Sequence, residues 1–101
     1  MDTILDERKA IIKAILQEAR YFPNSYCPHL FDIITSDEQE QHFILTRLGW
    51  ENGVHEYSVL FHIELKLDGT IWVHENKTDV PIEQYLMEKG IPYEAIKAAM
   101  F

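Results

Sequence analysis

The chain has 101 residues, of which 47% are hydrophobic and 12% aromatic, so it is long enough to bury one core and too short for two. Its 17 acidic residues outnumber the 9 Lys and Arg, and the net charge of −8 disfavours direct binding to nucleic acid, whose phosphates repel such a surface. The apolar runs are too short to span a bilayer, and the first residues do not resemble a secretory signal. One cysteine, Cys27, cannot form an internal disulfide, so we expect a single cytoplasmic domain over residues 1–101.

The N-terminal segment predicts an amphipathic helix over residues 3–22. Its apolar residues recur at helical spacing and are Ile4, Ile11, Ile12, Ile15, Ala19 and Phe22. Pro23 disfavours helical geometry in the residue before it, which ends the helix there. We expect this helix to cover the core of a sheet rather than to bind a partner.

Two strands follow, and both are rich in residues that favour β structure. They are predicted over residues 30–35 and 42–50, with a polar loop over residues 36–41 between them. Asn52-Gly53 is the dipeptide most typical of a two-residue hairpin turn. A third strand should therefore run antiparallel to the second.

The third strand alternates between apolar and polar residues. One face carries Tyr57, Val59, Phe61, Ile63 and Leu65, and the other carries Glu56, Ser58, His62, Glu64 and Lys66. Leu60 is the exception to this alternation. We expect the first set to face the core.

Asp68-Gly69 predicts a second turn, whose length sets the register of a fourth strand. A three-residue loop with Gly69 in a left-handed conformation aligns apolar residues across the turn, namely Leu65 with Ile71 and Ile63 with Val73. The same register sets His62 opposite His74 and Glu64 opposite Trp72 on the other face.

Two short helices are expected at the C-terminal end. Pro81 opens the first, which carries Ile82, Tyr85 and Leu86 and ends at Gly90. Pro92 starts the second, which carries Ile96 and Met100. The expected fold class is α+β, with an N-terminal helix, a four-stranded antiparallel sheet arranged as a meander, and two short C-terminal helices.

Catalytic and metal-binding patterns are weak. The five histidines lack the spacing of a metal site, so we expect neither a metal nor another cofactor. Cys27 lies near His29, but a buried structural cysteine explains it better than an activated thiolate does. The sequence therefore favours a binding protein over an enzyme.

The apolar content exceeds what one sheet face can bury, so either helices cover both faces or a partner covers one. The expected partner surface is the face that carries Leu60, His62, Glu64, Trp72 and His74. A tryptophan flanked by polar groups suits an interface, either with a different chain or with a second copy in a homo-oligomer.

Several runs of residues carry a family resemblance. They are Gly49-Trp50-Glu51, His62-Ile63-Glu64-Leu65, the stretch from Asp68 to Asn76 that reads D-G-T-I-W-V-H-E-N, and Glu88-Lys89-Gly90-Ile91-Pro92. In this order they resemble the XisI-like family, the fdxN element excision controlling factors of cyanobacteria.

The resemblance implies an accessory role in site-specific DNA excision, in which a separate recombinase cuts the DNA and a XisH-like protein is the partner. An antitoxin-like role, in which the chain neutralises a nuclease-like partner, belongs to the same binding class. The alternative from a different class is a metal- or small-ligand-binding domain, with or without enzymatic activity, at His62, Glu64, Trp72 and His74.

Overall fold

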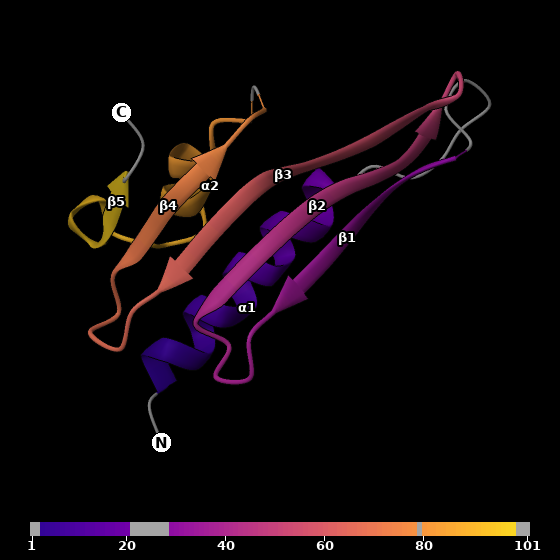
Figure 1. Cartoon of the computed structure of the whole chain (residues 1–101). Coiled ribbons are helices and arrows are strands. Elements are labelled where there is room, and N and C mark those ends of the chain that lie inside the picture. Colours follow the sequence, from indigo (N-terminus) through magenta and orange to yellow (C-terminus); the bar gives the residue numbers. More distant parts are fainter. Residues whose placement is uncertain (1–2, 21–28, 79, 99–101) are drawn as a thin grey trace.

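The computed structural model describes residues 3–20, 29–78 and 80–98 (Figure 1). In chain order its elements are α1 (Thr3–Ala19), β1 (Leu30–Ser36), β2 (His42–Glu51), β3 (Val54–Leu65), β4 (Ile71–Asn76), α2 (Ile82–Glu88), the 3-10 turn η1 (Tyr93–Ala95) and β5 (Ile96–Ala98). The α+β class, the N-terminal helix and the helix after Pro81 are thereby confirmed. The N-terminal helix ends at Ala19, three residues before its predicted end at Phe22, which lies outside the described residues. No helix in the described ranges is long and apolar enough to cross a membrane.

The five strands form one sheet in the order β1-β2-β3-β4-β5. The first four pair antiparallel as a meander, but the prediction of a four-stranded, wholly antiparallel sheet was wrong, because β5 adds a fifth strand that runs parallel to β4. The prediction of a helix carrying Ile96 and Met100 was wrong, because Ile96–Ala98 is a strand; Met100 lies outside the described residues. Tertiary pairing outweighs local helix propensity here, since β5 covers an edge of β4 and Ile96 packs against the core.

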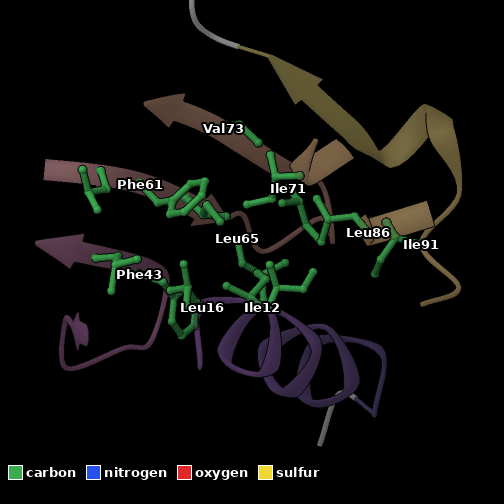
Figure 2. Packing of buried hydrophobic residues seen from close by; sticks show 14 residues of the cluster. Ile12, Leu16, Phe43, Phe61, Leu65, Ile71, Val73, Leu86 and Ile91 are labelled. Atoms are coloured by element: carbon green, nitrogen blue, oxygen red, sulfur yellow. The ribbon is translucent and has the colours of Figure 1, made fainter. Parts of the chain in front are cut away.

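Both helices pack on the same face of the sheet, behind the strands in Figure 1. Their buried side chains are Ile12, Ile15, Leu16, Ile82 and Leu86. Figure 2 shows Ile12 of α1 beside Leu65 and Leu16 of α1 beside Phe43, while Leu86 of α2 lies near Ile71. Among the described elements none lies over the opposite face, so helices do not cover both faces.

A bulge in β3 interrupts its pairing with β2. Leu45 pairs with Phe61, but the next residue, Thr46, pairs with Val59, so Leu60 is the extra residue. In such a bulge both residues that oppose one partner can point to the same side of the sheet. Leu60 and Phe61 are accordingly both buried in the core.

The bulge reverses the alternation in the part of β3 that precedes it. Tyr57, which was expected in the core, is 67% exposed, and Val59 is only half-buried. Leu60, which was expected on the opposite face, is 8% exposed within the core. These three face assignments were wrong because a bulge shifts the two-residue period by one.

Both predicted turns are confirmed. Asn52 and Gly53 have φ values of +53° and +78° and join β2 to β3 as a two-residue loop. Gly69 has φ +91° at the end of a three-residue loop, and its N–H donates to the Lys66 carbonyl over 2.9 Å.

The register after the second turn is also confirmed near the turn. The predicted pairs that are present are Leu65 with Ile71, Ile63 with Val73 and Glu64 with Trp72. The pairing of His62 with His74 was wrong, because a second bulge, in which His74 is the extra residue of β4, sets His62 opposite Glu75.

Candidate functional site

Four of the predicted site residues meet on the uncovered face of the sheet, and His42 joins them. Cross-strand pairing places His42, Glu64 and Trp72 in one row across β2, β3 and β4. His62 lies two residues from Glu64 on the same strand face, and the β4 bulge keeps His74 beside it. These five residues are called the histidine cluster below.

The three imidazole rings of the cluster form a chain. Ring centroids are 5.2 Å apart between His42 and His62, and again 5.2 Å apart between His62 and His74. His42 Nδ1 lies 3.0 Å from His62 Nε2, so one of these nitrogens donates and the other accepts. This contact requires that at least one of the two rings be neutral.

The surroundings of His62 favour its neutral form. Burial lowers the pKa of His62 below its ordinary value of 6.5, and the nearby His74 and His42 lower it further when they are charged. Glu64 acts in the opposite direction but does not outweigh these effects.

Glu64 is the anionic centre of the cluster. His74 Nε2 donates a hydrogen bond of 2.8 Å to its Oε1, and this bond is the main reason that the pKa of Glu64 is lowered. The other carboxylate oxygen lies 3.9 Å from His42 Nε2 and 4.0 Å from Lys66 Nζ. The side chain is still 21% exposed, so a partner could reach it.

Trp72 is held in place by polar groups. Its indole N–H donates to Thr70 Oγ1 over 3.1 Å, and the Thr70 hydroxyl donates to Asp68 Oδ1 over 2.7 Å. Lys66 Nζ lies 5.1 Å from the centroid of the indole ring. The ring is therefore oriented while still half-buried, as an interface anchor would be.

The loop before β2 positions His42. The Asp37 carboxylate accepts backbone N–H bonds from His42 over 2.8 Å and from Gln41 over 2.7 Å. These bonds lower the pKa of Asp37, and the bond from the His42 N–H has the largest effect. Lys13 of α1 forms an ion pair with Glu40, which has φ +54°. The loop is thus fixed against the helix and sets the first residue of β2 in the cluster.

The same sheet face becomes apolar toward the β2–β3 turn. Its members there, called the hairpin strip below, are Phe31, Ile33, Ile44, Leu48, Trp50, Tyr57 and Val59. Phe31, Trp50 and Tyr57 are 48%, 58% and 67% exposed. None of the seven is charged, in a chain where 26% of the residues are.

The geometry gives no support to metal chemistry. In residues 3–20, 29–78 and 80–98, no three His, Cys, Asp or Glu side chains are placed to hold a metal ion. A shallow hollow beside Trp72 is lined by Tyr93, Glu94, Ile96, Lys97 and Ala98, and no histidine lines it. Cys27 lies outside the described residues. What the cluster offers is a carboxylate, imidazoles and an aromatic ring, which can recognise another molecule by contact.

Leu60 was predicted in the site and His42 was not, and one cause explains both errors. A two-residue turn without a bulge would set His42 opposite Ile63, whereas the bulge at Leu60 sets it opposite Glu64. The break in alternation at Leu60 was the one available sign of this shift.

The fold and the site define a two-layer α+β domain in which helices cover one sheet face and none of the described elements covers the other. The family model for the XisI protein matches residues 1–100. The chain therefore belongs to the XisI family, which confirms the resemblance noted in the sequence.

Two solved structures have the same fold. A XisI-like protein from Anabaena variabilis superposes with a TM-score of 0.77 at 23% identity, covering 92% of this chain and 84% of the other. The fdxN element excision controlling factor XisI from Anabaena variabilis gives a TM-score of 0.70 at 21% identity, covering 93% and 84%. A comparison with curated proteins finds no match.

Proposed function

We propose that this chain is a non-enzymatic accessory factor in the excision of a DNA element, and that it binds a XisH-like protein through the histidine cluster. Membership of the XisI family supports a role in excision control, since a structural relative carries the name of an excision controlling factor. The observation that carries the binding role is the half-buried Trp72, whose indole N–H donates to Thr70 Oγ1 on a sheet face that no described helix covers.

The cluster combines an anchor with a polar rim. Trp72 can bury its remaining surface against a partner with little loss of side-chain freedom, because Thr70 and Lys66 already restrict it. Glu64 and His74 are partly exposed and can bond to groups at the edge of the contact. Tryptophan anchors with such surroundings often contribute about 2 kcal/mol or more to binding.

The charge of the chain favours a basic protein partner over DNA. At a net charge of −8 the surface attracts a positively charged protein and repels phosphates, and the 9 Lys and Arg are scattered along the sequence. Contact with the DNA element would then be made by the partner, and we expect the chain to act in the cytoplasm.

The test is a titration of the chain with a XisH-like protein from the same organism, followed by calorimetry. Trp72→Ala should weaken binding by about 30-fold, which corresponds to the anchor contribution, while the circular dichroism spectrum stays unchanged. Trp50→Ala is the matched control, because it removes the same side chain from the far end of the same face.

Three outcomes would contradict the proposal. The first is the lack of a complex between the wild-type chain and the XisH-like protein. The second is an equal effect of Trp72→Ala and Trp50→Ala on binding. The third is loss of the folded state in Trp72→Ala, because Trp72 would then be part of the core.

A further inference from the structure

The hairpin strip is unusual for a surface with this composition. Its seven residues span β1, β2 and β3 in adjoining rows, because Leu48 pairs with both Phe31 and Tyr57 and Thr46 pairs with both Ile33 and Val59. The intervening Thr46 is also uncharged. A contiguous apolar area of this kind is rare on a monomer and commonly marks an interface.

The area is sufficient for a stable pair of molecules. The exposed fractions of Phe31, Trp50 and Tyr57 amount to about 350 Å² if a free aromatic side chain offers about 200 Å². Ile33 is 43% exposed and the other aliphatic members are only partly exposed, so the strip offers roughly 500 Å² per molecule, or about 1,000 Å² for two, which is near the smallest area of a specific interface.

The molecule is elongated, with extents of 46 × 27 × 22 Å, because β2 and β3 reach beyond the helices (Figure 1). The hairpin strip lies largely on this projecting part of the sheet. A sheet with helices on one face leaves the other face as the natural place for a second layer, and two twisted sheets pack face to face at about −30°.

We infer that the hairpin strip binds the hairpin strip of a second copy, forming a twofold face-to-face dimer. The charge distribution selects this occupant. Two chains that each carry a charge of −8 repel one another except through a region without charge, and the strip is such a region. A basic partner would gain nothing from it, because the strip offers no carboxylate to pair. This inference does not depend on the proposed XisH-like partner.

The experiment is sedimentation of the full chain over concentrations from about 1 to 100 µM. We expect a mass of about 24 kDa, twice the 11.9 kDa of one chain, at the upper end. Tyr57→Glu should raise the dissociation constant by about 100-fold or more, because each copy then buries a carboxylate. Tyr93→Glu is the matched control, since Tyr93 is 73% exposed but lies outside the strip.

The salt dependence gives a second readout. Dimerisation through an uncharged strip should be unchanged or stronger when salt screens the repulsion between two acidic chains. A monomer at all concentrations, a dimer that dissociates with salt, or a dimer that Tyr57→Glu and Tyr93→Glu affect equally would overturn the inference. Phe31→Glu, at a second exposed position of the strip, must repeat the result of Tyr57→Glu.

Discussion

Gly49→Ala should be strongly destabilising, because the backbone of the neighbouring segment occupies the space that the new methyl group needs. Gly49 has φ +139°, and a Cβ built there lies 1.9 Å from the His29 carbonyl oxygen and 2.9 Å from its carbon. The same oxygen accepts a hydrogen bond of 3.1 Å from the Trp50 N–H. Relieving this clash requires the backbone to move and the hydrogen bond to break, and the alanine is also strained at positive φ. We therefore expect the free energy of unfolding to fall by about 3 kcal/mol or more.

The control is Gly53→Ala, in which only the backbone conformation is strained. Gly53 has φ +78°, and no atom of the described chain lies within 4 Å of its built Cβ. That substitution should cost about 1 kcal/mol. For a domain of this size the melting temperature falls by about 4–8 °C per kcal/mol of lost stability. It should therefore fall by about 12 °C or more in Gly49→Ala and by about 4–8 °C in Gly53→Ala.

Thermal and urea unfolding of both variants measure this difference. A similar loss in the two would mean that the close approach between Gly49 and His29 does not exist in solution. The result also matters for the hairpin strip, because the position of β1 against β2 sets Phe31 beside Leu48.

Lowering the pH from 7 to 5.5 should reduce the free energy of unfolding, because the pKa of His62 is below 6.5 in the folded state and the unfolded chain therefore takes up the proton first. His62→Gln should flatten this dependence in urea titrations, and an unchanged slope would contradict the depressed pKa. Leu60→Ala should cost about 2–4 kcal/mol because Leu60 is in the core, whereas Val59→Ala should cost less than about 1 kcal/mol. Equal costs would argue against the bulge that separates the two side chains.

The turns of the sheet were predictable because the residues that form them have strong local preferences. Asn52-Gly53 and Gly69 adopt the left-handed conformations that their turns require, and the second register follows from keeping Ile63 and Leu65 on the buried face. These features depend on a few neighbouring residues, so the sequence contains the information needed.

The bulges and β5 were not predictable in the same way. The bulge at Leu60 lets both Leu60 and Phe61 pack in the core. Only the packed structure shows that this arrangement is preferred to regular pairing. The segment Ile96–Ala98 becomes a strand because an edge of β4 is available to it, which is a tertiary effect. The errors in the predicted site came from the bulge at Leu60, because this bulge removed Leu60 from the open face and brought His42 to it.

The open sheet face divides into two regions that can be tested separately. The row that contains Ile44 and His62 separates the charged end, with Glu64 and Trp72, from the uncharged end, with Trp50. A partner selected by charge would bind the first end, and a second copy of an acidic chain would bind the other. Because each tryptophan lies in one region, Trp72→Ala and Trp50→Ala should separate partner binding from self-association. If either variant impaired both activities equally, the face would act as a single surface and the two proposals could not both stand.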